Sequence, residues 1–104
     1  MKITIEELQE YLFDHYKNGG IDQSLFMKLV EEIGEVAEVL NKKAGRKSVG
    51  QEDLQTQLGN ELADVVHYTI AIAALNGIDM NDIILSKDKD ASICLLYTSP
   101  SPRD

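Results

Sequence analysis

The sequence predicts an all-α protein, a small antiparallel bundle of four helices that is completed by oligomerisation. Three observations predict this class. Apolar residues recur at helical spacing, strand-like alternation is absent, and residues 1–93 contain no proline to interrupt the backbone ladder. The same stretch is rich in residues that favour helix. A segment of roughly ninety residues forms one domain, but buries only a limited share of its surface, so association with further copies is expected.

The last eleven residues, 94–104, differ from the rest. Their sequence, CLLYTSPSPRD, contains the single cysteine and both prolines of the chain. It resembles the in-frame translation of a transposase adapter used to prepare sequencing libraries. We therefore expect a helical domain at residues 1–93 and a non-native tail at 94–104. The alternative is a genuine disordered tail.

The first helix is expected to begin at Thr4. The hydroxyl of Thr4 and the carboxylate of Glu7 are spaced as a capping box, in which each satisfies an exposed amide at a helix start. The residues Asn18–Gly20 offer a left-handed stop. Between these ends, an apolar stripe is formed by Leu8, Tyr11, Leu12 and Tyr16.

The second helix is expected to start with Asp22 or Ser24 as its cap and to end near Ala44. After it, residues 41–50 lose the periodicity and gather basic side chains beside two glycines. This segment is either a solvated turn or a basic flap that touches phosphate oxygens. The apolar positions expected to face the core are Phe26, Leu29, Val30, Ile33, Val36, Ala37 and Leu40.

The third helix is expected to run from about Gln51–Asp53 to Asn76. Gly77 follows as its stop, and Asp79 is placed to cap a short fourth helix.

The formal net charge of −8 indicates which partners suit the chain. Such an acidic balance repels nucleic-acid backbones, so no nucleic-acid polymer is expected as a partner and cations are favoured. Residues 1–93 contain no cysteine, and no stretch resembles a secretion signal or a membrane span. We therefore expect a soluble protein of the cytoplasm that has no membrane partner.

Acidic residues cluster along the second helix. At about 100° per residue, Glu32 and Glu35 lie on one shoulder of the apolar stripe, with Lys28 between them in angle. Glu31 and Glu38 project further toward solvent. An acidic, solvated helix face would explain this pattern on its own.

The acids of the third helix are harder to explain as a solvated helix face. Glu61 faces the core, Asp64 lies beside it one turn on, and Tyr68 follows along the same ridge. Because buried carboxylates need a compensating charge, two adjacent acids there require a cation. If the second and third helices pack antiparallel, four carboxylates share one volume, which suits Mg²⁺ or Mn²⁺.

The two acidic motifs resemble those of a known family. EEIGE at residues 31–35, followed after 25 residues by ELAD at 61–64, is similar to the EExxE and ExxD signature of MazG-like nucleotide pyrophosphohydrolases. The likeness extends from about Leu25 to Lys89. It implies an all-α homodimer or homotetramer that uses Mg²⁺ to hydrolyse a nucleoside triphosphate substrate to monophosphate and pyrophosphate. A role in clearing the nucleotide pool is consistent with it.

The resemblance also implies residue roles. Lys28 would neutralise or orient phosphate, and Tyr68 would border the nucleoside pocket. The general base remains open among three carboxylates, namely Glu35, Glu31 and Glu38. The metal ligands would be Glu32, Glu35, Glu61 and Asp64.

Other signals are weaker. His67 makes a carboxylate-x-x-histidine spacing with Asp64, but di-iron bundles need two such motifs, so we interpret His67 as a helix-surface or interface residue. Met27, Met80, Phe13 and Phe26 are interpreted as core or dimer packing, and Tyr68 could equally be a core residue. The alternative function is an acidic helical interaction or adaptor module without catalysis.

Overall fold

The computed structural model describes residues 1–19, 21–45 and 53–88. These residues form four α-helices: α1 (Ile5–Tyr16), α2 (Asp22–Lys43), α3 (Leu54–Leu75) and α4 (Met80–Lys87). No strand occurs among them, so the predicted all-α class with four helices is confirmed. The expected tail at 94–104 and residues 46–50 of the basic connection, with Arg46 and Lys47, lie outside the described residues.

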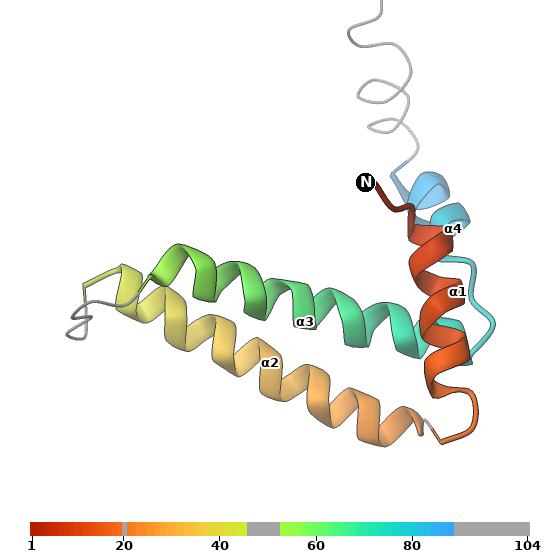
Figure 1. The fold of residues 1–104 in the computed structure, drawn as a ribbon, viewed down its shortest axis with the longest axis horizontal. Helices are drawn as coiled ribbons and strands as arrows, with labels where there is room; N and C mark the ends of the chain where they lie inside the picture. The colour runs from red at the N-terminus through yellow and green to blue at the C-terminus, as the bar shows by residue number, and fades with distance from the viewer. Residues whose placement is uncertain (20, 46–52, 89–104) are drawn as a thin grey trace, which may run out of the picture.

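The two long helices, α2 and α3, form an antiparallel hairpin (Figure 1). α1 crosses the end of this hairpin where α2 begins and α3 ends, and α4 lies against α1. α1 therefore packs on the C-terminal half of α3. One face of the α2–α3 hairpin is not covered by α1.

Most helix ends follow from local sequence. The capping box is confirmed, because the Thr4 amide donates to Glu7 Oε1 over 2.8 Å and the Glu7 amide donates to Thr4 Oγ1 over 3.0 Å. The Asp53 carboxylate caps α3 and the Asp79 carboxylate caps α4. At the end of α3, Gly77 adopts a φ of 67°, the left-handed conformation that a glycine stop supplies.

The predicted cap of α2 is wrong. Ile21 is the N-cap and makes no side-chain cap bond, while Asp22 is already the first helical residue. Its carboxylate instead accepts a hydrogen bond of 3.1 Å from Asn76 Nδ2. Asp22 therefore ties the start of α2 to the end of α3. The expected glycine stop after α1 is not seen at Gly19, which has no positive φ, and Gly20 lies outside the described residues.

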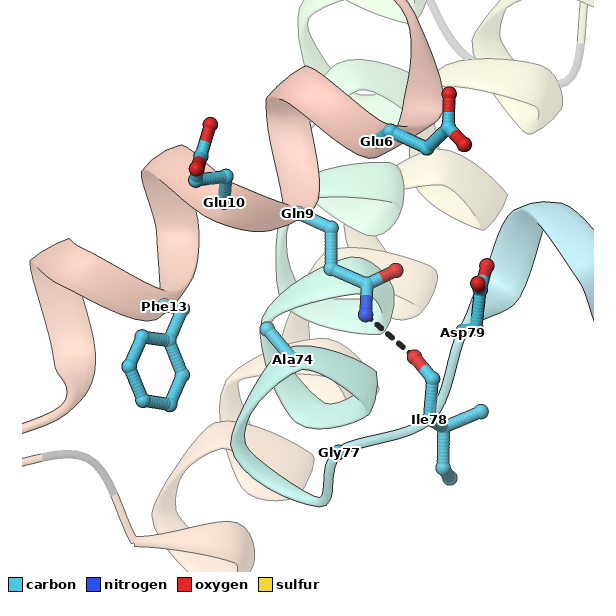
Figure 2. Close-up of a pocket in the computed structure, with 8 residues that line it drawn as sticks. All are labelled: Glu6, Gln9, Glu10, Phe13, Ala74, Gly77, Ile78 and Asp79. Carbon is cyan, nitrogen blue, oxygen red and sulfur yellow. Dashed lines mark hydrogen bonds between the residues drawn. The ribbon is translucent and has the colours of Figure 1, made fainter.

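The Gln9 side chain of α1 forms hydrogen bonds with the connection between α3 and α4 (Figure 2). Its side-chain amide donates to the Ile78 carbonyl and accepts from the Met80 amide. A hollow surrounds this contact and is lined by Glu6, Gln9, Glu10, Phe13, Ala74, Gly77, Ile78 and Asp79.

The core lies where α1 crosses the hairpin. Its central cluster consists of Leu12, Leu25, Ile70 and Ala71, and Leu12 is 0% exposed. The other buried residues among those described are Val39, Ala73 and Ala74. α1, α2 and α3 thus all contribute to one small core.

The expected inward stripe of α2 is largely wrong. Its members Phe26, Val30, Ile33 and Leu40 are each 45–55% exposed. α2 meets α3 through a line of Leu25, Leu29, Glu32, Val36 and Val39, whose members are buried or half-buried. Leu29 and Val36 belong to the expected stripe and are placed as predicted, whereas Ala37 is exposed.

Several aromatic and sulfur-containing side chains also lie outside the core of the single chain. Met27, Phe13 and Tyr11 are exposed, and Met80 is half-buried against the core cluster.

Within the described ranges, no helix combines the length and apolar character that crossing a membrane requires.

Candidate metal centre

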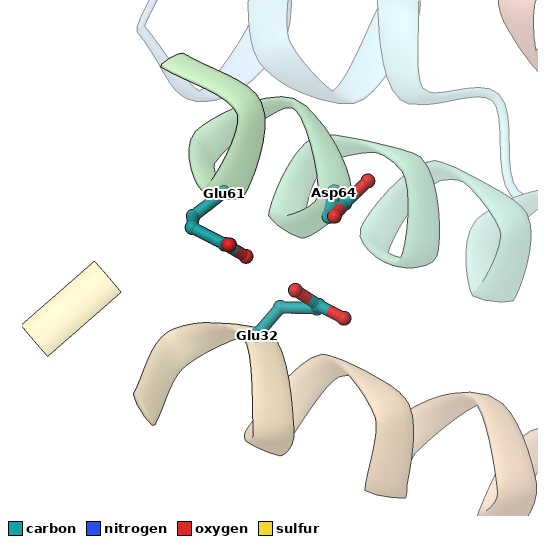
Figure 3. Close-up of side chains that lie close together, drawn as sticks. All are labelled: Glu32, Glu61 and Asp64. Carbon is teal, nitrogen blue, oxygen red and sulfur yellow. The ribbon is translucent and has the colours of Figure 1, made fainter. Parts of the chain in front are cut away.

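Three carboxylates meet between α2 and α3. Glu32 comes from α2, whereas Glu61 and Asp64 come from α3, and one oxygen of each lies within 4.8 Å of those of the other two (Figure 3). Glu32 and Glu61 are half-buried and Asp64 is exposed. The cluster therefore sits at the mouth of the helix interface rather than in its dry centre.

The placement of these acids follows from helical periodicity. Glu32 takes a position in the line of α2 that faces α3, between Leu29 and Val36. Glu61 takes the equivalent place on α3, and Asp64 follows it at i+3 on the same face. Antiparallel packing of the two helices then brings the acids together across the hairpin.

The electrostatics of the cluster are unfavourable without a cation. A hydrogen bond with Glu61, burial and the negative charge of Asp64 raise the pKa of Glu32 above its ordinary value. Nearby Lys28 opposes this shift only weakly. The Glu32 carboxyl therefore retains its proton to a higher pH than a free glutamate, and a bound cation would offset the same repulsion.

The positive charge of Lys28 is not paired with the three carboxylates of the cluster. Its ammonium nitrogen lies 3.3 Å from Glu31 Oε1, in an exposed ion pair along α2. The hydrogen bond with Glu31 is the main reason that the pKa of Lys28 is raised, with smaller contributions from Tyr68 and Glu32. The Lys28 ammonium therefore interacts electrostatically with Glu32 of the cluster, but its ion pair is with Glu31, which lies outside the cluster.

The structure brings together three of the four predicted ligands. Glu35 is exposed on α2 and does not belong to the group formed by the other three. Glu31 and Glu38 are also exposed, as their angular positions predict. The roles of these three acids as ligand or base remain predictions.

Tyr68 and His67 lie one turn beyond Asp64. Tyr68 is half-buried and packs against the core cluster, as the packing alternative predicts. His67 is half-buried at the contact between α3 and α1, where its ring shares a hydrogen bond of 2.7 Å with the Tyr16 hydroxyl. In the sequence, Tyr16 is recognisable only as a member of an apolar stripe. The contact joins residues 51 positions apart, so no local spacing signals it.

The donor set fits a hard divalent cation. Three carboxylates offer oxygen atoms, which are the ligands that Mg²⁺ and Mn²⁺ prefer, and a site with few protein ligands leaves positions for water and phosphate oxygens. The gathered negative charge also raises the pKa of Glu32, and a bound cation would offset it. Glu32, Glu61 and Asp64 could therefore hold such an ion.

The fold and the site together define an all-α protein with an acidic centre suited to a divalent cation. The family model described as the MazG nucleotide pyrophosphohydrolase domain matches residues 22–89, which is more than half of the chain. The chain belongs to this family, as the two acidic motifs predicted. The match spans α2, α3 and α4 and leaves α1 outside. A search of curated proteins gave no match to the chain.

Proposed function

We propose that the protein is a Mg²⁺-dependent nucleoside triphosphate pyrophosphohydrolase. The reaction converts an NTP or dNTP and water to the nucleoside monophosphate and pyrophosphate, and serves to clear the nucleotide pool of the cytoplasm. The observation that carries this proposal is the convergence of Glu32, Glu61 and Asp64 across the α2–α3 hairpin of a MazG-family chain. Either a ribo- or a deoxyribonucleotide is compatible with it.

Glu32, Glu61 and Asp64 would hold the Mg²⁺, with Mn²⁺ as a substitute. The bound ion would supply positive charge that offsets the charge of the phosphate oxygens and of the departing pyrophosphate. Glu35 follows Glu32 by one turn of α2 and remains a candidate fourth ligand. Its exposed position would let the side chain reach the cluster by a change of rotamer.

Residues of the chain would also accept the proton that the attacking water loses. A carboxylate beside the cluster would accept a proton from the attacking water as its oxygen bonds to the α-phosphorus. The bond from the α-phosphorus to its bridging oxygen then breaks, and pyrophosphate leaves. Glu35 is the best placed of the three candidates, because Glu31 pairs with Lys28 and Glu38 lies further along α2.

Lys28 and Tyr68 would bind the substrate. In the free protein Lys28 pairs with Glu31, and a bound phosphate would compete for the same ammonium. Tyr68 lies one turn past Asp64 and would border the nucleoside.

The exposed apolar residues support a homodimer or homotetramer. On each helix of the hairpin, an exposed apolar stripe lies roughly a quarter turn from the α2–α3 contact, displaced in the same rotational sense. Because the helices run antiparallel, both stripes then face the same side of the hairpin. A second copy would bury this apolar face, which consists of Phe26, Val30, Ile33, Leu40, Leu62 and Val66.

A screen for pyrophosphate release would test the function. The purified protein would be incubated with Mg²⁺ and each common ribo- and deoxynucleoside triphosphate. We expect release from at least one of them, lost with EDTA and in Glu61→Gln. The matched control is Glu10→Gln, which removes an exposed acid of α1 and should keep the wild-type rate. Absence of release from every nucleotide would refute the proposal.

A further inference from the structure

Tyr16, the last residue of α1, joins this helix to α3 beside the candidate metal centre. Its ring packs against the core cluster of Leu12, Leu25, Ile70 and Ala71. Its hydroxyl forms the 2.7 Å hydrogen bond with Nε2 of His67 on α3. Tyr16 precedes the segment that the family model matches, so the match assigns it no role.

The contact continues from His67 to Tyr68. The Tyr16 and His67 rings meet edge to face, with centroids 5.7 Å apart and an interplanar angle of 83°. The His67 and Tyr68 rings do the same at 4.8 Å and 72°. Burial raises the pKa of Tyr16, and so do the charge of neighbouring Tyr68 and a side-chain hydrogen bond with it. Three rings from two helices therefore restrain one another.

Tyr68 in turn adjoins the acidic cluster. It follows Asp64 by one helical turn, on the same side of α3 as Glu61. Its charge when ionised also contributes to the raised pKa of Lys28, which lies on α2. A contact that limits the rotation of the Tyr68 ring therefore also fixes the position of a side chain at the edge of the acidic cluster.

We propose that Tyr16 is a positioning residue of the metal centre, which holds His67 and thereby fixes the Tyr68 ring beside the carboxylates where the nucleotide binds. The proposal rests on the proposed function for its substrate. Without the hydroxyl, the His67 ring loses its hydrogen-bond partner on α1, so it would restrain the Tyr68 ring less firmly. α1 is then a part of the site as well as of the core.

The test uses Tyr16→Phe, which removes only the hydroxyl and keeps the ring that packs on the core. Tyr11→Phe is the matched control, because it removes an exposed hydroxyl from the same helix. With the nucleoside triphosphate that wild type hydrolyses fastest, we expect Tyr16→Phe to raise KM about fivefold, the equivalent of one lost hydrogen bond. The value of kcat should stay within about twofold if only positioning is lost. Unchanged KM would overturn the proposal.

A second measurement separates this proposal from the proposed function. Bound Mn²⁺ broadens the NMR signals of nearby protons, so the broadening of the Tyr68 ring signals reports its placement relative to the cluster. We expect Tyr16→Phe to change that broadening and to shift the His67 imidazole nitrogen signals, and Tyr11→Phe to change neither. His67→Phe, which keeps a ring between the two tyrosines but has no nitrogen, should change the broadening in the same way.

The outcomes are distinct. If wild type releases no pyrophosphate but Tyr16→Phe still changes the Mn²⁺ broadening of Tyr68, the proposed function fails and the positioning role stands. If Tyr68 broadening is the same in wild type, Tyr16→Phe and His67→Phe, the positioning role is refuted, whatever the enzyme activity.

Discussion

Glu32 is the side chain at which the charges of the acidic cluster interact most unfavourably. Its carboxyl shares a hydrogen bond with Glu61 and lies beside Asp64, and its pKa is raised as a result. A group whose pKa is higher in the folded chain stabilises folding at low pH, and that stabilisation is lost as the pH rises through the folded pKa. The cluster that would bind a cation therefore weakens the metal-free fold near neutral pH.

This reasoning predicts a pH dependence of stability. In EDTA, the thermal unfolding midpoint should fall as the pH is raised from about 4.5. Glu32→Gln should reduce that fall and raise the midpoint at pH 7, because the neutral amide removes the repulsion. Thermal denaturation followed by circular dichroism measures both effects. Glu10→Gln is the control for simple loss of one negative charge. If Glu10→Gln and Glu32→Gln raise the midpoint equally, the effect belongs to net charge and not to the cluster.

Leu12 is the residue on which the small core depends most. It is fully buried where α1 crosses the hairpin, so Leu12→Ala would leave a cavity among the core cluster. We expect a loss of about 2–5 kcal/mol in the free energy of unfolding, measured by urea denaturation. The neighbouring Tyr11→Ala should cost much less, because Tyr11 is 60% exposed. Similar losses for the two variants would contradict the described packing of α1.

At the scale of a single helix, the capping box of α1 is a local device. Thr4→Ala removes the hydroxyl that accepts from the Glu7 amide, and should lower the free energy of unfolding by about 1 kcal/mol. Thr69→Ala is the contrasting change, because the Thr69 hydroxyl donates to the Val65 carbonyl within α3 and caps nothing. Chemical denaturation of both variants would show whether the loss is specific to the cap.

Helix ends and helix faces differ in how well the sequence predicts them. Ends depend on a few adjacent residues, and the capping box at Thr4, the cap at Asp79 and the stop at Gly77 are all found as predicted. The start of α2 departs from prediction because Asp22 bonds to Asn76, a residue of another helix.

The face that α2 presents to α3 was predicted wrongly for a related reason. The helix carries two apolar lines side by side, and the line through Ile33 is the more continuous in sequence. Only the packing of α3 selects the line through Leu25 and Val39. Periodicity identifies an apolar side chain but does not decide which neighbour covers it.

The candidate site shows the same limit. Glu61 and Asp64 could be recognised because acids interrupt an otherwise apolar helix, and Glu32 because its motif repeats their spacing. The exposed position of Glu35, outside the cluster, is known only once the two helices are packed. The bond between Tyr16 and His67 depends on how α1 crosses the hairpin, which sequence spacing does not encode.

At the scale of the whole molecule, the exposed apolar face of the hairpin predicts association. Ile33→Asp would place a charge in the centre of this face and should convert the wild-type oligomer to a monomer with unchanged helix content. Light scattering coupled to size-exclusion chromatography measures the mass, and circular dichroism the helix content. Ile3→Asp, at an exposed position before α1, is the control and should keep the wild-type mass. A monomeric wild type at micromolar concentrations would contradict the proposed assembly.

The central claim is that carboxylates from α2 and α3 together bind a divalent cation. Titration of Mn²⁺ into the metal-free protein, followed by electron paramagnetic resonance of the free ion, tests this claim most directly. The account predicts saturable uptake by wild type, accompanied by a higher unfolding midpoint, and loss of both in Glu61→Gln but not in Glu10→Gln. If wild type takes up no Mn²⁺, or if Glu61→Gln takes up as much as wild type, the account is contradicted.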